Sequence, residues 1–154
     1  MEAHMKHNHY RHLLLMMVLS FVAMYILMYS MVDKLANVVP NINQLYMAAL
    51  MTAPMLIIEL TIMGGMYENK KLNSILLAIG VVALVGFFFL IRHQTAVSDK
   101  QFLKSMIPHH AGALLMCEKV NLKDPEIKEL CRKIMIGQQD EIDQMKAKLN
   151  SLKN

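Results

Sequence analysis

Long runs without charged residues dominate the first two thirds of the chain. Residues 13–32 and 74–91 contain no charged side chain, and residues 45–67 contain only Glu59. A helix of about 20 apolar residues is long enough to cross the roughly 30 Å of hydrocarbon in a bilayer. We therefore expect three transmembrane helices over these ranges, which indicates a multi-pass protein of the cytoplasmic membrane.

After residue 98 the pattern changes to apolar and charged positions that alternate with the period of a helix. Two amphipathic helices are predicted, separated by residues 121–125, where Asp124 suits the N-cap and Pro125 the first turn of a new helix. Such a short connection indicates an antiparallel pair. The sequence thus predicts an all-α protein in which the three transmembrane helices precede a soluble helical hairpin at 98–152.

The first predicted amphipathic helix carries soft metal ligands on one face. At about 100° per residue, six residues fall within an arc of about 120°; they are Met106, His109, His110, Ala113, Met116 and Cys117. Thioether and thiol sulfur beside imidazole suit Cu(I) and related thiophilic ions. The alternative is an apolar packing face with two histidines near a proline kink.

The second amphipathic helix has a matching stripe with Glu141 at its edge. The stripe comprises Ile127, Cys131, Ile134, Met135, Gln138, Ile142, Met145 and Leu149. Folding the pair about residue 124 places Cys117 opposite Cys131, His110 opposite Gln138, and Met106 opposite Ile142. We expect the metal ligands to come from His109, His110, Met106, Met116 and Met145. Gln138 and Glu141 are expected to orient the imidazoles, as metal sites usually require.

Cys117 and Cys131 leave three alternatives open. A disulfide needs Cα atoms within roughly 7 Å, whereas packed helices usually lie 8–10 Å apart, so a bridge requires the helices to converge near the turn. A disulfide or redox-active pair ranks first, ahead of buried free thiols and a pair of copper-binding thiolates.

The last third of the chain also carries an extended motif. Its first part comprises Asp99, Phe102, Leu103, Met106-Ile107-Pro108-His109-His110, Ala113 and Met116. Its second part comprises Ile134, Gln138, Glu141, Ile142 and Met145. From residue 98 to 152 the chain resembles the domain-of-unknown-function 305 family, ferritin-like helical domains that include the CopM-like periplasmic copper-binding proteins.

This resemblance implies copper handling and a four-helix bundle. One hairpin supplies only two helices, so a homodimer, or packing against another protein, would complete the bundle. Cys117 and Cys131 stand where the family more often has alanine, and the resemblance therefore implies no role for them.

The membrane segments are rich in methionine. Met17, Met24, Met28 and Met31 fall within an arc of about 60°. Steps of four residues separate Met47, Met51, Met55, Glu59 and Met63. Methionine is an adaptable filler of helix interfaces, but an ionisable residue within a membrane span is a functional candidate. Glu59 is therefore a secondary metal candidate; the alternative is a protonated carboxyl hydrogen-bonded to Tyr25, Tyr29 or Thr61.

The first twelve residues form a histidine-rich tail of the kind that binds metal ions. It adds four secondary metal candidates, which suit Cu(II), Ni(II) or Zn(II): His4, His7, His9 and His12.

Basic residues indicate the orientation. Lys6 and Arg11 precede the first run and Lys70 and Lys71 precede the third, whereas Lys34 is alone between the first two. We expect a cytoplasmic N-terminus and an extracytoplasmic, periplasmic C-terminal domain, although the basic residues Arg92, Lys100 and Lys104 favour the reverse.

The remaining features narrow the class of function. The net charge of +4 is modest and scattered, so no nucleic-acid partner is expected. There is no phosphate-binding loop, G-x-S-x-G, C-x-x-C or Glu-x-x-His motif, and we expect no enzyme. The predicted function is membrane-anchored binding of Cu(I), or a similar soft ion, in metal tolerance or in delivery to a transport or metallochaperone partner. The alternative is a structural membrane subunit whose hairpin dimerises without metal.

Overall fold

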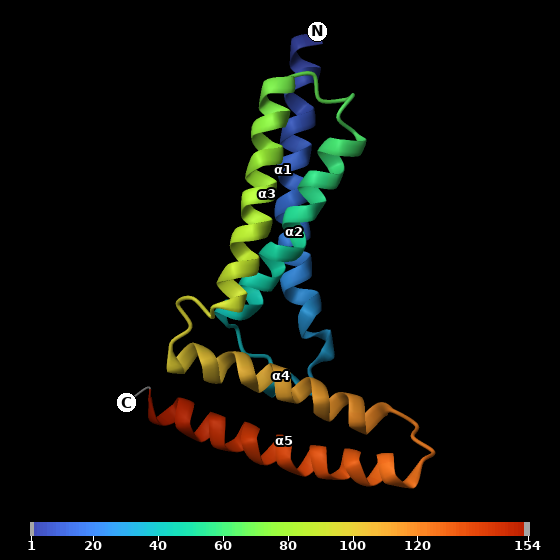
Figure 1. Ribbon diagram of the computed structural model, residues 1–154, viewed down its shortest axis with the longest axis vertical. Helices are drawn as coiled ribbons and strands as arrows, with labels where there is room; N and C mark the ends of the chain where they lie inside the picture. Colours follow the sequence, from blue (N-terminus) through green and yellow to red (C-terminus); the bar gives the residue numbers. More distant parts are fainter. Residues whose placement is uncertain (1, 153–154) are drawn as a thin grey trace. The chain divides into compact units, whose positions relative to one another are not determined.

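The computed structural model describes the backbone of residues 2–152 and the side chains of residues 9–152. All the regular secondary structure of the described residues is helical, which confirms the all-α prediction (Figure 1). The α-helices are α1 (Glu2–Leu27), α2 (Ile42–Ile62), α3 (Lys70–Arg92), α4 (Asp99–Lys119) and α5 (Pro125–Ser151). Two short 3₁₀-helices, η1 (Met28–Met31) and η2 (Leu35–Asn37), lie between α1 and α2. The side chains of His4 and His7 lie outside the described residues.

Three helical segments are long and apolar enough to cross a membrane. They are His9–Met31, Ile42–Ile62 and Lys70–Arg92. Local capping explains why α2 and α3 begin earlier than expected. The Asn41 side chain accepts a hydrogen bond from the Gln44 backbone N–H at 2.9 Å, at the start of α2. The Asn69 side chain accepts from the Leu72 N–H at 3.0 Å and starts α3. Both follow the preference of asparagine for helix N-caps.

The chain forms two compact units, of which the first comprises Met1–Leu27 and Leu45–Thr95. Helices α1, α2 and α3 run alongside one another in this unit (Figure 1). Its core consists of Leu13, Leu60 and Tyr67, packed by Tyr10, Met16, Met17, Leu56, Leu76 and Leu77. Helix α3 approaches α2 closely at Gly80, where a Cβ atom would lie 2.9 Å from Cγ1 of Ile57. Most of the apolar surface of α1 and α3 is left uncovered within the unit.

The second unit comprises Met28–Gln44 and Ala96–Asn154. Helices α4 and α5 lie side by side and run in opposite directions (Figure 1). As predicted, Asp124 caps α5, because its carboxylate accepts hydrogen bonds from the backbone N–H groups of Glu126 and Ile127, with Pro125 in the first turn. The core consists of Ile107, Ala111, Leu114, Ile142 and Leu149, joined by the partly buried Val32, Val39, Leu103, Met135 and Met145.

The segment 28–44 packs on α4 and α5, an association that the sequence analysis did not anticipate. The Ile42 N–H donates to Oε1 of Gln101 on α4 at 3.1 Å, and the Asn43 side-chain amide donates to Oγ of Ser105 at 3.2 Å. Val32 and Val39 add apolar contacts with the core. The segment between α1 and α2 is therefore part of the same folded unit as α4 and α5.

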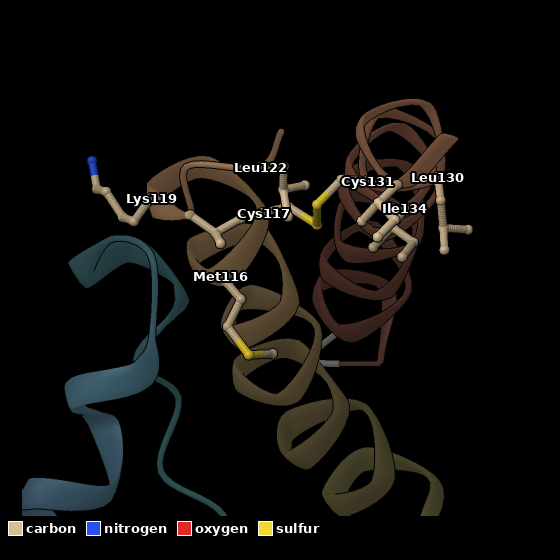
Figure 2. Close-up of a pocket in the computed structure, with 9 residues that line it drawn as sticks. Met116, Cys117, Lys119, Leu122, Leu130, Cys131 and Ile134 are labelled. Atoms are coloured by element: carbon tan, nitrogen blue, oxygen red, sulfur yellow. A yellow bond between two sulfur atoms is a disulfide. The ribbon is translucent and has the colours of Figure 1, made fainter. Parts of the chain in front are cut away.

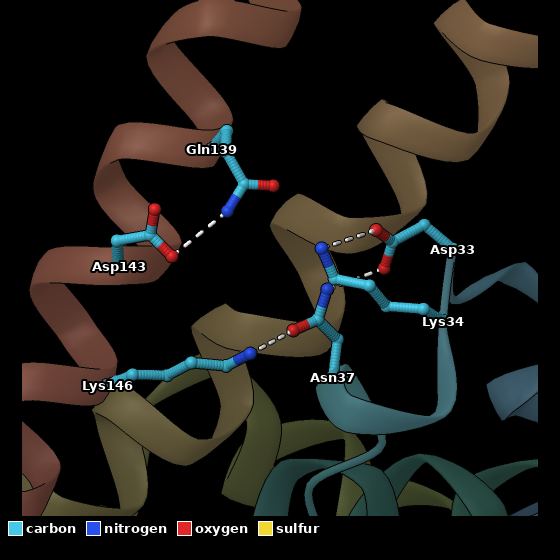
Figure 3. Close-up of polar contacts among 6 residues, drawn as sticks. All are labelled: Asp33, Lys34, Asn37, Gln139, Asp143 and Lys146. Atoms are coloured by element: carbon cyan, nitrogen blue, oxygen red, sulfur yellow. Dashed lines mark hydrogen bonds and ion pairs between the residues drawn. The ribbon is translucent and has the colours of Figure 1, made fainter.

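A buried asparagine fixes this segment to α5 (Figure 3). Asn37 is fully buried, its side-chain N–H donates to Oδ1 of Asp33 at 2.6 Å, and its Oδ1 accepts from Nζ of Lys146 on α5. Burying a polar side chain is costly unless its hydrogen bonds are made. Because Asp33 and Lys146 satisfy both ends of the amide, they hold the segment in one position on α5.

Candidate metal site on α4 and α5

The face that α4 turns to the core is rotated from the one predicted. Ile107, Ala111 and Leu114 are buried, whereas His109 is exposed and Met116 is 55% exposed. The prediction chose the face richest in soft ligands, but α4 carries apolar residues on several sides. Packing against both α5 and the segment 28–44 selects the aliphatic face instead.

His110 is the candidate ligand that this rotation brings against α5. Its side chain is only 12% exposed, and Nδ1 lies 2.9 Å from Oε2 of Glu141. The ring N–H direction nevertheless does not meet the requirements of a hydrogen bond, and Nδ1 is buried without a hydrogen-bond partner among the described residues. The contact with Glu141 is therefore electrostatic, and Nδ1 makes no hydrogen bond with the described residues. Glu141, one of the two residues expected to orient the imidazoles, lies beside His110.

The surroundings of His110 favour its neutral form. Burial lowers the pKa of the imidazole below its usual value, the Glu141 carboxylate opposes this, and the neighbouring His109 lowers the pKa again. A neutral imidazole is the form that binds metal ions, because it keeps a free lone pair.

The other candidate ligands differ in their burial and in their position relative to His110. The ring of His109 has its centroid 5.9 Å from that of His110, at an interplanar angle of 59°. Met106 is half-buried one turn before His110, on the same side of α4, and Met145 packs against the core. Gln138 is half-buried on α5, one turn before Glu141.

Among the residues whose side chains are described, no group of three or more His, Cys, Asp or Glu gathers as a metal site would require. A metal ion at His110 would therefore need thioether donors as well as imidazoles. Sulfur and imidazole in combination select soft ions over Mg²⁺ or Ca²⁺.

Cys117 and Cys131 form a disulfide, the alternative ranked first, with their Cα atoms 5.5 Å apart. Helices α4 and α5 therefore do converge near their connection. In this oxidised state neither sulfur is a thiolate ligand. The bridge links residues 14 positions apart, and closing a loop of about 15 residues contributes about 3 kcal/mol in the chain-entropy account.

A shallow apolar groove of about 540 Å³ borders this disulfide (Figure 2). It is lined by Met116, Cys117, Lys119, Val120, Leu122, Ile127, Leu130, Cys131 and Ile134. The Met116 thioether extends along α4 away from the disulfide (Figure 2). The groove contains no carboxylate or imidazole, so its surface suits apolar or soft ligands.

In the first unit, the carboxylate of Glu59 on α2 has a partner that sequence reasoning missed. The Tyr67 hydroxyl donates to Oε1 of Glu59 at 2.9 Å, whereas Thr61, one of the predicted partners, donates to its own helix at the Ile57 carbonyl. The ring of His9 lies against that of Tyr67, with centroids 6.5 Å apart, and His12 is exposed. The sequence feature that could have identified this partner is Tyr67, the last residue of the apolar run 45–67.

Comparison with known proteins extends the similarity beyond the motif on α4 and α5. A family described as a domain of unknown function, DUF305, matches residues 58–149, from within α2 almost to the end of α5. An uncharacterized protein of Acanthamoeba polyphaga mimivirus is 32% identical over 144 residues, which cover 92% of this chain and 93% of that protein. No solved structure matches the chain. The protein therefore belongs to the DUF305 family.

Proposed function

We propose that this protein binds Cu(I), or a similar soft ion, on the unit formed by α4, α5 and the segment 28–44. The observation that carries the proposal is the buried Nδ1 of His110, which has no hydrogen-bond partner among the described residues although Glu141 lies beside it. An unsatisfied buried nitrogen costs free energy, and a bound metal ion would remove that cost. The role is metal tolerance or delivery, with a transport or metallochaperone protein as partner.

His110 and His109 are the proposed nitrogen ligands, with Met106 and Met145 as sulfur donors. Adjacent helical residues point about 100° apart, so both imidazoles reach one ion only when the ion sits between helices. Glu141 lies beside the same Nδ1 of His110 that would bind the ion, so its carboxylate would lie next to that ion, and Gln138, one turn away, would orient an imidazole. The exposed Met116 is better placed to meet an ion shared with a second molecule than one buried against α5.

Ferritin-like, CopM-like copper binding in a four-helix bundle is the finer form of this proposal. Two helices make half of such a bundle, and a second copy would complete it. Large apolar side chains remain exposed on α4, at its C-cap and on α5, and would be covered in a dimer: Phe102, Met116, Val120, Ile127, Leu130 and Ile136. The same observation favours the second candidate function, a membrane subunit whose α4 and α5 dimerise without metal.

The expected test is a Cu(I) titration of the full-length protein in detergent, with the disulfide intact and a chromophoric chelator as competitor. His110→Ala and Met106→Leu should each weaken binding at least tenfold, because each removes a donor. His93→Ala is the control, since His93 stacks on Phe89 at the end of α3.

Native protein that binds Cu(I) no tighter than micromolar, or variants that bind equally well, would contradict the metal proposal. A dimer that forms without metal and survives both His109→Ala and His110→Ala would support the second candidate function.

We further propose that α1, α2 and α3 span the membrane, with the N-terminus cytoplasmic and α4 and α5 outside. The segment 28–44 packs in one unit with α4 and α5, so both must lie on the same side. Two spans, α2 and α3, separate them along the chain, and two crossings return the chain to the side from which it started.

Single introduced cysteines in a Cys117→Ser, Cys131→Ser background test this arrangement. In intact cells, Lys34→Cys and Glu126→Cys should react with a membrane-impermeant maleimide, whereas Lys71→Cys should react only after permeabilisation. Opposite accessibility of Lys34→Cys and Glu126→Cys would rule the arrangement out.

A further inference from the structure

The disulfide between Cys117 and Cys131 borders two surface cavities. Both cysteines line the apolar groove of about 540 Å³ described above. They also line a second, more polar hollow of about 330 Å³, together with Lys128, Arg132 and Met135. Because both cysteines line surface cavities and are only partly buried, a small thiol or a metal ion can approach the disulfide without unfolding the helices.

A third sulfur borders the second hollow. Met135 follows Cys131 by one helical turn, so the two side chains project from the same side of α5, and Met135 lines the hollow with both cysteines. The Cα atoms of the cysteines are 5.5 Å apart, a spacing that allows both sulfurs to contact one ion after the S–S bond opens. Lys128 lines the same hollow, and positive charge stabilises thiolates.

We propose that reduction of this disulfide creates a second soft-metal site, formed by the Cys117 and Cys131 thiolates and the Met135 thioether. The reductant is a dithiol, which supplies two electrons and two protons. The Cys117–Cys131 bond breaks, both cysteines become thiols, and the dithiol becomes a disulfide. Binding of Cu(I) then releases the two thiol protons to solvent. In the oxidised protein the site is closed.

This site is separate from the one at His110 and does not rest on it. Cys117 follows His110 by seven residues, a rise of about 10.5 Å along α4. Metal–ligand bonds are about 2.0–2.3 Å, so one ion does not reach both positions. Substitutions at His109 and His110 therefore test one site, and substitutions at Cys117 and Cys131 test the other.

The test is an anaerobic Cu(I) titration of the full-length protein in detergent, either oxidised or treated with a dithiol that is removed before metal is added. We expect the reduced protein to bind one more Cu(I) per chain than the oxidised protein, with ultraviolet absorption from thiolate-to-copper charge transfer. The additional ion should persist in the His109→Ala, His110→Ala variant and disappear in the Cys117→Ser, Cys131→Ser variant.

Two further variants probe the thioether. Met135→Leu should weaken binding of the additional Cu(I) about tenfold. Ile134→Leu, which changes the neighbouring side chain without removing sulfur, should leave that affinity unchanged. Circular dichroism checks that the serine variant remains helical. Equal stoichiometry in the oxidised and reduced protein, or an additional ion that survives the serine substitutions, would overturn the proposal.

Discussion

Replacing Ile142 by alanine should lower the free energy of unfolding of the α4 and α5 unit by about 2–5 kcal/mol. Ile142 is fully buried in the core with Ile107, Ala111 and Leu114. Truncation removes apolar contacts with α4 and leaves a cavity that neighbouring side chains fill only in part. Hydrogen exchange of the most protected amides of α4 and α5, in the full-length protein, measures the loss.

Ile136→Ala provides the matched control on the same helix. Ile136 is 53% exposed, so its truncation creates no cavity and should change stability by no more than about 0.5 kcal/mol. If these amides exchanged at the same rate in the two variants, Ile142 would not be at the centre of the packing between α4 and α5.

Replacing Asn37 by alanine should destabilise the same unit by about 2–3 kcal/mol, with the loss concentrated in the segment 28–44. The amide is fully buried and bonds to two ionised groups, Asp33 and Lys146. A hydrogen bond to a charged group contributes about 1.5–3 kcal/mol, and removing the amide also leaves those groups without their shared partner.

Hydrogen exchange of the backbone N–H groups of residues 37 and 38 reports detachment of the segment 28–44, since both groups are hydrogen-bonded within that segment. Gln139→Ala is the control, because the Gln139 side chain donates to Asp143 at 3.0 Å on the same helix (Figure 3). Unchanged exchange in the segment after Asn37→Ala would mean that Val32 and Val39 hold it in place without the polar contacts.

The two metal proposals assign different chemistry to positions about two turns apart on one helix pair. His110 offers a neutral nitrogen beside a carboxylate, and the disulfide offers sulfur only after reduction. The family match begins at residue 58, so α3 and the end of α2 are part of what this chain shares with the family.

The sequence alone determined the features that depend on local pattern. Uncharged runs located the three apolar helices, and Asp124 with Pro125 located the start of α5. Counting from the connection placed Cys117 opposite Cys131, which is where the disulfide lies. Each of these depends on residues close together in the chain, for which composition and spacing carry enough information.

Tertiary structure decided which face of α4 is buried, what covers it and which group pairs with Glu59. Several rotations of α4 bury apolar residues, so its periodicity did not distinguish the face of Ile107 from that of His109. The choice follows from packing against α5 and the segment 28–44, and the Tyr67 contact with Glu59 follows from the course of the chain after α2. Such contacts join residues that are separated along the sequence, and their energies depend on packing that no local pattern contains.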